Sequence, residues 1–575
     1  MLPINKAHLK LLTLFICLFI VSCQNKKAEH QTVDSNAKPK LIVQITIDQL
    51  RGDLPLRFMD KMSENGFKYF YTNGVVYNNA HHAHSNTETI VGHASLATGA
   101  YPSTHGMIAN VWLNRETGVL SYNIEDPRFS LLSADADVNQ KTEIDPTQKK
   151  ARSSGRSPAN IKVSTFSDEL KLASNGKAKV FGVSVKDRGA VSFAGHTGKA
   201  FWFSKKSGEF VTSNYYYKSY PEWVKSWNAE KHQLFYADTN WELSNSIDSY
   251  LFGENDNQEW EVDLAGFGRT FPHKFGKGDG KYYNTLLTIS PAGDEITSKF
   301  AQSVITNEKL GQDDITDFLS VSFSSTDYVG HMFGPSSLEM EDNLLRLDKT
   351  LAQFIQFIDE NVGLENTLIV LSADHGSPEA PGYLNSLGME ASTVDFSQLD
   401  KDPAIERLKQ RFGIGQELIS EFFPPYLYLN HDVINERKLD LSEVQKAVAE
   451  EVAKFKIVEH AVTSADLNAG SIPTTNVLQK VINNHDPRRA GDIYLVFKPH
   501  SFVNNFDGLH VASYHGSVWN YDTYVPVIFA GHTIKNKTIH RRIETVDIAP
   551  TLSALMGIKP PSGTDGFLLP EVLEK

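Results

Sequence analysis

Four apolar runs constrain the fold of this chain most, because each is typical of a buried β-strand that ends abruptly at a polar group. The runs LIVQITID, KVFGVSVKDR, DFLSVSFSSTD and TLIVLSADHG end at Asp48, at Lys186 and Arg188, at Asp327, and at Asp374 and His375. Near-continuous valine, isoleucine and leucine indicates strands covered on both faces, as in a parallel sheet flanked by helices. Ligands of such sheets bind beyond the carboxyl ends of the strands, so these polar side chains are expected along one edge.

The same pattern predicts an α/β fold. Strands alternate with helices along the chain, which is typical of a mostly parallel central sheet flanked by helices. Further strands are predicted at 492–498 and 525–531, a long helix at 337–363, and a last helix at 546–558 with Asp547 as its N-cap. With 575 residues, of which 41% are hydrophobic and 22% charged, the chain can bury a large core. A small disulfide-stapled fold is excluded.

The N-terminus carries the pattern of an export signal. The apolar run before Cys23 follows Lys6 and Lys10 and is too short for a comfortable membrane span. It ends in Ile-Val-Ser-Cys, which resembles the lipobox of bacterial lipoproteins; an ordinary secretory signal is the alternative. We therefore expect a signal peptide at 1–22, a lipidated Cys23 that attaches the protein to a membrane, and a flexible tether at 23–39. The protein would then be exported, to the periplasm or the outer membrane.

Residues 40–575 are predicted to form a single domain with two insertions. Segments at about 201–283 and 378–491 interrupt the strand and helix pattern, the first with tryptophans and glycines and the second with proline-rich loops, and both are expected to cap the active edge. The net charge of −13 at pH 7 disfavours nucleic acid as a partner. An anionic small molecule would need a local source of positive charge.

Six residues at or near the strand ends have the side chains of a metal centre. Asp327 and His331 are four residues apart, so a helical turn after the strand would place them together. Asp374 and His375 are adjacent and can reach one ion only from an irregular loop, which the following glycine and proline permit. The full set is Asp48, Asp327, His331, Asp374, His375 and His515. It can supply six ligands to one ion or two sets of three.

The order of these residues, with a threonine segment between the first and second strands and the closing motifs DIAPTLSALMG and GTDGFLL, resembles the alkaline phosphatase superfamily over nearly all of residues 40–575. The resemblance implies an alkaline-phosphatase-like catalytic domain with two zinc ions on opposite sides of a phosphoryl group. It assigns Asp327, His331 and His515 to one zinc, and Asp48, Asp374 and His375 to the other. Calcium or magnesium could replace zinc, because mixed Asp and His sets bind several divalent ions.

The stretch SNTETIVGHASLATGAYPSTHGMIAN, residues 85–110, contains the candidate nucleophile. Thr89 begins a predicted helix, where backbone N–H groups and the helix dipole favour an anion. The competing hydroxyls are Ser85, Thr87 and Ser95. In the superfamily pattern an asparagine follows the nucleophile by 21 residues, which selects Thr89, also a ligand of zinc, and Asn110 as a donor to a phosphoryl oxygen.

Several other histidines are expected to be structural. His93 and His105 lie in or near the predicted helix, where an imidazole can bond to backbone groups, and the six ligand positions are already filled. The tract His-His-Ala-His at 81–84 is interpreted as a loop that approaches the site. Two His-Asp pairs, at 431–432 and 485–486, do not end a clear buried strand.

Lys186 and Arg188 bear on the choice between phosphate monoesters and diesters. A monoester dianion has an additional anionic oxygen, and two cations at positions i and i+2 would face the same side if strand geometry continued. This pair, with a threonine nucleophile and Asn110, resembles the phosphate-irrepressible, PafA-like branch of the superfamily. Nucleotide pyrophosphatases usually follow the threonine with Phe-Pro-Asn, whereas this chain has Ile-Val-Gly at 90–92.

The sequence therefore predicts an exported alkaline phosphatase, acting as a monomer on small-molecule phosphate monoesters through a phosphothreonine at Thr89. A phosphodiesterase or nucleotide pyrophosphatase of the same superfamily is one alternative, since a diester needs only a roomy apolar pocket. A non-catalytic ligand-binding lipoprotein is the alternative from another class.

Overall fold

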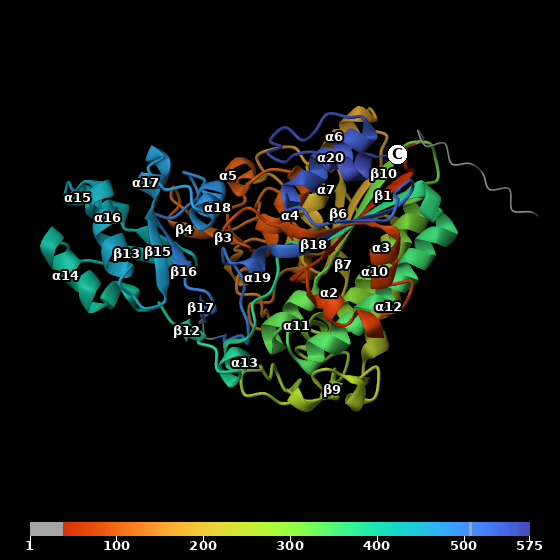
Figure 1. The fold of residues 1–575 in the computed structure, drawn as a ribbon, viewed down its shortest axis with the longest axis horizontal. Coiled ribbons are helices and arrows are strands. Elements are labelled where there is room, and N and C mark those ends of the chain that lie inside the picture. Colours follow the sequence, from red (N-terminus) through yellow and green to blue (C-terminus); the bar gives the residue numbers. More distant parts are fainter. Residues whose placement is uncertain (1–37, 505–508, 575) are drawn as a thin grey trace, which may run out of the picture. The chain divides into compact units, whose positions relative to one another are not determined.

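One large β-sheet organises the protein (Figure 1). The computed structural model describes residues 38–504 and 509–574; the predicted signal peptide, Cys23 and nearly all of the tether lie outside the described residues. The strands, in spatial order, are β19 (Lys537–Ile539), β2 (Val75–His81), β18 (Tyr524–Gly531), β11 (Thr367–Ser372), β1 (Leu41–Ile47), β10 (Asp317–Phe323), β5 (Val180–Ser184), β6 (Lys199–Phe203) and β7 (Phe210–Val211), and β20 (Ile543–Glu544) pairs with β2.

The centre of this sheet is parallel, and its flanks are mixed. Strands β11, β1, β10, β5 and β6 run parallel to one another, whereas β18 is antiparallel to both β11 and β2. The four apolar runs of the sequence are β1, β5, β10 and β11, and they are neighbours in the parallel part. Their carboxyl ends therefore meet at one edge, and the predicted α/β fold is confirmed.

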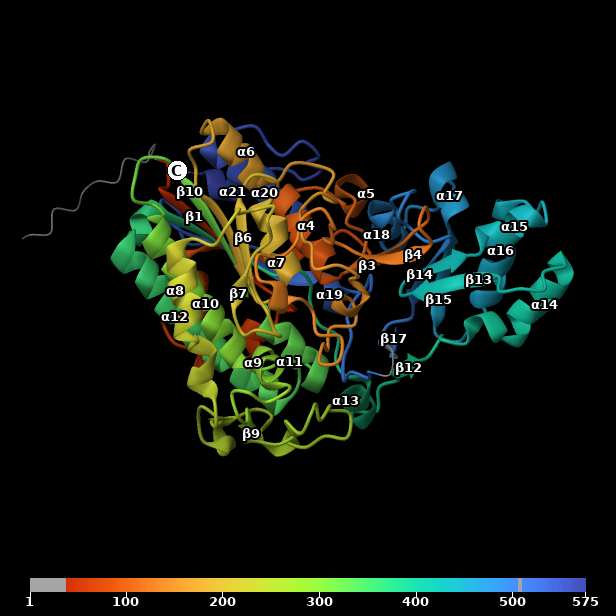
Figure 2. The same cartoon turned by 180° about the vertical axis from the view of Figure 1, so that it is seen from behind.

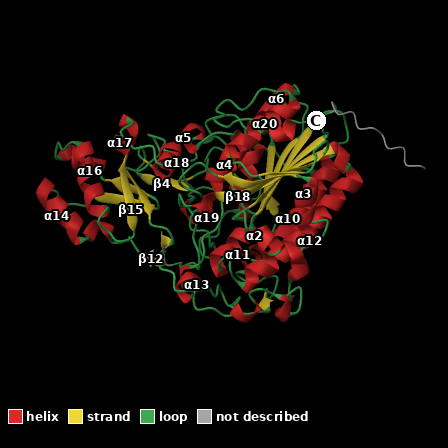
Figure 3. Ribbon diagram, in the orientation of Figure 1, coloured by secondary structure: helices red, strands yellow, loops and turns green. Residues whose placement is uncertain are grey.

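Both faces of the sheet are covered by helices (Figures 2 and 3). Leu41, Val43 and Ile45 of β1 share a core with α10 (Pro291–Glu308) and α12 (Leu338–Asn361), and Ile42 shares a core with helices of the other face. Those helices are α4 (Thr89–Thr98), α6 (Phe166–Ala173), α7 (Asp187–Ala194) and α20 (Ile548–Met556). Among the described residues, no helix combines the length and apolar composition needed to span a membrane.

The predicted strand at 492–498 belongs to a different sheet. It is β16 (Ile493–Phe497), in a four-stranded sheet with β13 (Ile419–Phe423), β14 (Tyr426–Leu429) and β15 (Val458–Thr463). This sheet lies within the second predicted insertion and its margin, and it packs against α14 (Pro403–Phe412) and α16 (Leu441–Val452) around a core of its own. An apolar run reports that a strand is buried but not which sheet buries it.

Two further predictions differ from the structure. The segment 201–283 begins inside the main sheet, because most of β6 and all of β7 lie in it. Phe201, Phe203 and Phe210 of these strands pack into the same core as Leu41, Val43 and Ile45 of β1. Asp547 does not cap α20 with its side chain, although α20 begins directly after it. Its carboxylate instead accepts from the backbone N–H groups of Glu544, at 3.0 Å, and Phe567, at 2.7 Å.

Candidate active site

Helix α11 (Ser325–Phe333) begins just after β10 and carries two of the first set of candidate ligands, Asp327 and His331; the third, His515, lies in a loop. Asp327 Oδ1 lies 3.3 Å from His331 Nε2 and 3.2 Å from His515 Nε2. The Nδ1 atom of each histidine faces a backbone carbonyl oxygen, that of Ser513 for His331 at 2.8 Å and that of Thr87 for His515 at 2.7 Å. These contacts orient each ring so that Nε2 is directed at the carboxylate. The three ligand atoms all lie within 4.8 Å of one another.

Asp48, Asp374 and His375 form the second set, beyond the ends of β1 and β11. His375 Nε2 lies 3.5 Å from Asp48 Oδ1 and 3.5 Å from Asp374 Oδ2, and all three residues are fully buried. A group of three ligand atoms within 4.8 Å on this side consists of Asp48, Asp327 and His375. The structure therefore brings all six candidate ligands together, and Asp327 belongs to both groups.

Lys186 joins the two sets. Its Nζ lies 2.8 Å from Asp48 Oδ2 and 2.5 Å from Asp327 Oδ2. The strand geometry expected to align Lys186 with Arg188 does not continue, because β5 ends at Ser184 and Arg188 lies in the first turn of α7. As a result Lys186 pairs with Asp48 and Asp327, whereas Arg188 pairs with Asp145. A contact between Lys186 and a phosphoryl oxygen stays a prediction.

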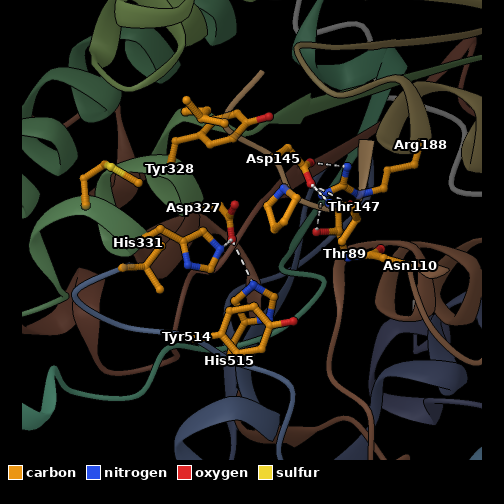
Figure 4. A pocket seen from close by; sticks show the side chains of 14 residues that line it. Thr89, Asn110, Asp145, Thr147, Arg188, Asp327, Tyr328, His331, Tyr514 and His515 are labelled. Atoms are coloured by element: carbon orange, nitrogen blue, oxygen red, sulfur yellow. Dashed lines mark hydrogen bonds and ion pairs between the residues drawn. The ribbon is translucent and has the colours of Figure 1, made fainter. Parts of the chain in front are cut away.

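A cavity next to the first set contains the candidate nucleophile (Figure 4). Thr89 is the first residue of α4, and Arg188 Nη2 donates to Thr89 Oγ1 at 3.2 Å. Asn110 Oδ1 accepts from Ile90 N at 3.1 Å, so the Asn110 amide nitrogen remains as a donor. The cavity also has apolar lining residues, which are Ile144, Pro146, Met332 and Val511.

Asp145 and Glu88 support this cavity, although neither was predicted from the sequence as a site residue. Arg188 Nη1 donates to Asp145 Oδ2 at 2.7 Å. Burial opposes ionisation of Asp145, but the nearby Arg188 charge helps hold the pKa of Asp145 well below its usual range. Glu88 Oε2 accepts from the Asn110 backbone N–H at 2.5 Å, and burial raises the pKa of Glu88 to about 7. Asp145 follows no apolar run, so no local pattern marks it; Glu88 could have been noted as the residue before the threonine.

The other histidines near the site have protein partners. His93 Nδ1 lies 3.0 Å from Asp374 Oδ2, and His105 Nε2 lies 3.0 Å from Ser95 Oγ. Among the residues that the structure describes, neither histidine nor the tract at 81–84 belongs to a group of three close ligand atoms. His93 thus contacts the candidate ligand Asp374 and can help to hold its carboxylate in position.

The two sets fit divalent cations. Both Asp48 carboxylate oxygens, Asp327 Oδ1, Asp374 Oδ2 and His375 Nε2 are buried, and none of them has a hydrogen-bond partner in favourable geometry within the described residues. Their close neighbours are one another, further histidines and the Lys186 ammonium group. Buried polar atoms in this state cost free energy, and a mixed imidazole and carboxylate set is what zinc and related ions bind. The donor chemistry therefore matches a two-ion centre.

A family model described as type I phosphodiesterase / nucleotide pyrophosphatase matches residues 42–518. The chain belongs to this family, within the alkaline phosphatase superfamily. All the candidate ligands, Thr89, Asn110, Lys186 and Arg188 lie inside the range that the phosphodiesterase-type model matches.

Three relatives match over almost their whole length. Alkaline phosphatase PafA of Elizabethkingia meningoseptica is 36% identical over 94% of this chain and 96% of its own. A Myroides odoratus protein named calcium-transporting ATPase is 33% identical over 94% and 95%, and alkaline phosphatase PhoV of Synechococcus elongatus is 32% identical over 98% and 100%. A crystal structure of wild-type PafA superposes with a TM-score of 0.84, at 34% identity, over 93% of this chain and 99% of that one.

Proposed function

We propose that this protein is an alkaline phosphatase that hydrolyses small phosphate monoesters with two zinc ions and a phosphothreonine intermediate at Thr89. The observation that carries the proposal is the position of the Thr89 hydroxyl, at the start of α4, within hydrogen-bond distance of Arg188 and in one cavity with Asp327, His331 and His515. Two near-full-length relatives are named alkaline phosphatases.

The residues of the cavity have distinct roles in the proposed reaction. Thr89 Oγ attacks phosphorus, the bond from phosphorus to the alcohol oxygen breaks, and water later releases the phosphoryl group from Thr89 as inorganic phosphate. Arg188 and the Asn110 amide nitrogen donate hydrogen bonds to phosphoryl oxygens, and Asp145 holds Arg188 in place. The zinc ions, when bound by the two sets, would supply positive charge that stabilises the developing oxyanions and lowers the pKa of the threonine hydroxyl.

Positive charge favours a monoester over a diester. Arg188 and Lys186 are both buried; Arg188 donates to Thr89, and Lys186 lies against Asp48 and Asp327. A monoester dianion gains more from these charges than a diester monoanion does. The apolar residues of the cavity favour the second candidate, a phosphodiesterase, because they could receive a second ester group.

The deciding experiment compares kcat/KM for a monoester and a diester that share one leaving group, on protein whose zinc content has been measured. We expect the monoester to be preferred by a factor of about 10² or more, equivalent to roughly 3 kcal/mol of differential transition-state stabilisation. A preference for the diester would select the phosphodiesterase candidate. If zinc-loaded protein hydrolyses neither substrate, the result would support a non-catalytic binding protein.

Export and lipidation rest on the sequence alone. The apolar run and the lipobox-like residues before Cys23 support a protein that is exported and tethered to a membrane by a lipid. Metabolic labelling with a radioactive fatty acid should mark the wild type and leave Cys23→Ser unlabelled. Equal labelling of both would contradict the assignment of Cys23.

A further inference from the structure

The second insertion contacts the segment that leads to Asn110. Helix α18 (Asn476–Asn484), part of this insertion, lies beside α5 (Pro102–His105), between it and the four-stranded sheet (Figures 1 and 2). The residues that join α5 to Asn110 belong to no helix or strand. Asn484 Nδ2 donates to Ile108 O at 3.1 Å, two residues before Asn110. Because an irregular segment has no helix or sheet hydrogen bonds to hold it, contacts of this kind fix its position.

Asn484 is buried, and its own insertion orients it. The residue has no exposed surface, and Nδ2 also donates to the hydroxyl oxygen of Tyr426, in β14, at 2.8 Å. A carbonyl oxygen can only accept, so the contact with Ile108 O requires the amide nitrogen on that side. Asn484 Oδ1 has no hydrogen-bond partner within the described residues. Burial of an unpaired amide oxygen costs free energy, so packing alone does not explain an asparagine at this position.

A second amide joins the same carbonyl group to Asn110. Asn86 Nδ2 donates to Ile108 O at 3.0 Å and to Glu88 Oε2 at 3.2 Å. Glu88 Oε2 also accepts from the Asn110 backbone N–H, and both Asn86 and Glu88 are buried. Ile108 O therefore accepts from one amide of the insertion and from one amide of the main domain. Buried hydrogen bonds that share partners strengthen one another, so loss of the Asn484 bond should change the position of Asn110.

The insertion also contacts the chain on the other side of Asn110. Arg489 Nη1 donates to Gly106 O at 2.6 Å, and the guanidinium carbon of Arg489 lies 4.6 Å from the centre of the Trp112 ring. Trp112 belongs to β3 (Val111–Asn114), which begins directly after Asn110. Residues before and after Asn110 are thus held by a segment that was expected only to cap the active edge.

We propose that Asn484 is a positioning residue, through which the second insertion holds the Asn110 amide nitrogen where it can donate to a phosphoryl oxygen. The inference rests on the proposed function, which gives Asn110 this role. Asn484 does not line the cavity that contains Thr89, so it acts through Asn110 and not on the substrate. A displacement of about 1 Å caused by a change far from the chemistry can cost a factor of about 10² in rate. A bond outside the cavity can therefore affect turnover.

The test is a double-mutant cycle of Asn484→Leu and Asn110→Ala in full-length, zinc-loaded protein. Leucine keeps the branched shape of the side chain and removes the donor to Ile108 O. Calorimetry gives the Kd of inorganic phosphate, and kcat/KM for a monoester and the zinc content are measured on the same samples. We expect Asn484→Leu to weaken phosphate binding and to lower kcat/KM by about tenfold, without loss of zinc. In the Asn110→Ala background the same substitution should change both by less than about twofold.

Asn483→Leu is the matched control. Asn483 belongs to the same helix, and its Nδ2 donates to a different backbone carbonyl of the main domain, Ala83 O, at 2.7 Å. The control therefore removes a donor of the same type without touching the segment before Asn110. It should change phosphate affinity and kcat/KM by less than about twofold, whether or not Asn110 is present.

Four results would overturn the proposal. They are no loss in Asn484→Leu, equal losses with and without Asn110, loss of zinc in Asn484→Leu, and an equal, Asn110-dependent loss in the control. If Asn110→Ala binds phosphate as tightly as the wild type, the proposed role of Asn110 fails together with the inference. If the wild type does not hydrolyse the monoester but phosphate binding shows the coupling, only the proposed function fails.

A second variant keeps the test decisive if Asn484→Leu does not fold. Tyr426→Phe removes the hydroxyl oxygen that accepts from Asn484 Nδ2 and leaves the ring in place. We expect it to weaken phosphate binding by about threefold, and only when Asn110 is present. A loss that is the same in the Asn110→Ala background would count against the proposal.

Discussion

The two ligand sets are built from the same residue types but lie in different environments. Asp327, His331 and His515 line the cavity, and the side chain of His331 is 16% exposed. The set of Asp48, Asp374 and His375 does not line that cavity and has no exposed surface. The difference indicates that the first set can exchange ligands with solvent and substrate, whereas the second is held inside the fold.

Packing explains why the second set is buried. Helix α4 covers the loop after β11 so closely that a Cβ atom at Gly92 would lie 1.8 Å from Asp374 O. Only glycine permits this approach, and the same helix begins with Thr89. Thr89 is therefore positioned by a helix that also encloses the second set. The contact of Gly92 with the Asp374 backbone fixes both the nucleophile and the buried ligands.

Removal of metal should give the largest effect and should separate the two sets. A soluble chelator is expected to abolish activity and to extract the two ions in separate kinetic phases, because His331 is partly exposed and Asp48, Asp374 and His375 are not. Activity should disappear with the faster phase. Zinc released and activity remaining are measured on the same samples over time. Simultaneous release of both ions would show that the difference in burial has no kinetic consequence.

Replacement of the nucleophile should cost almost as much. Thr89→Ala is expected to lower kcat by about 10³ or more, as loss of a covalent nucleophile does in other enzymes. Zinc content should be unchanged at the buried set, whose ligands remain. Thr89→Ser keeps a hydroxyl at the start of α4 and should retain most of the activity. Turnover by Thr89→Ala close to that of wild type would remove Thr89 from the proposed role.

Alanine variants of Lys186 and Arg188 should lose less activity than Thr89→Ala, and each should lose it in a different way. Arg188→Ala removes a donor to Thr89 and is expected to lower kcat/KM by roughly 10² without loss of zinc. Lys186→Ala removes the cation between Asp48 and Asp327, and it should reduce monoester hydrolysis more than diester hydrolysis. Both variants are assayed on a matched monoester and diester with zinc quantified. Equal losses of both substrates in Lys186→Ala would make its role structural.

Local sequence patterns were sufficient to predict the site residues that lie at the end of one strand or at the start of one helix. The parallel core was predictable because β1, β5, β10 and β11 are uniformly apolar and end at polar residues. The position of β16 was not, because a second core satisfies the same apolar pattern. Asp145 could not be found either, since only the folded chain brings it to Arg188. The predicted alignment of Lys186 with Arg188 was wrong for a related reason. The strand β5 ends at Ser184, and Arg188 lies in the first turn of α7.

The smallest effect is expected at a His and Asp pair beside the four-stranded sheet, where His431 begins α15 (His431–Glu436) and Asp492 directly precedes β16. His431 Nε2 lies 2.8 Å from Asp492 Oδ1, closer than His331 Nε2 lies to Asp327, but no metal group of the described residues includes it. His431→Gln should therefore change kcat/KM by less than about twofold and leave the zinc content unchanged. A large loss of either would show that a His and Asp pair outside both groups of close ligand atoms contributes to the metal site in this fold.

The same variant tests stability against pH. Burial opposes ionisation of Asp492, but the hydrogen bond from His431 and the charge of Arg115 hold the pKa of Asp492 below its usual value. A carboxyl with a lowered folded-state pKa contributes stability above the unfolded pKa of about 4, and the contribution is lost as pH falls through the folded value. His431→Gln should reduce the free energy of unfolding by less than about 1 kcal/mol near neutral pH, because His431 is partly exposed. This deficit should shrink once the pH falls through the folded-state pKa of Asp492, as urea titrations at several pH values would measure; a deficit that persists after Asp492 is protonated would contradict the assigned pairing.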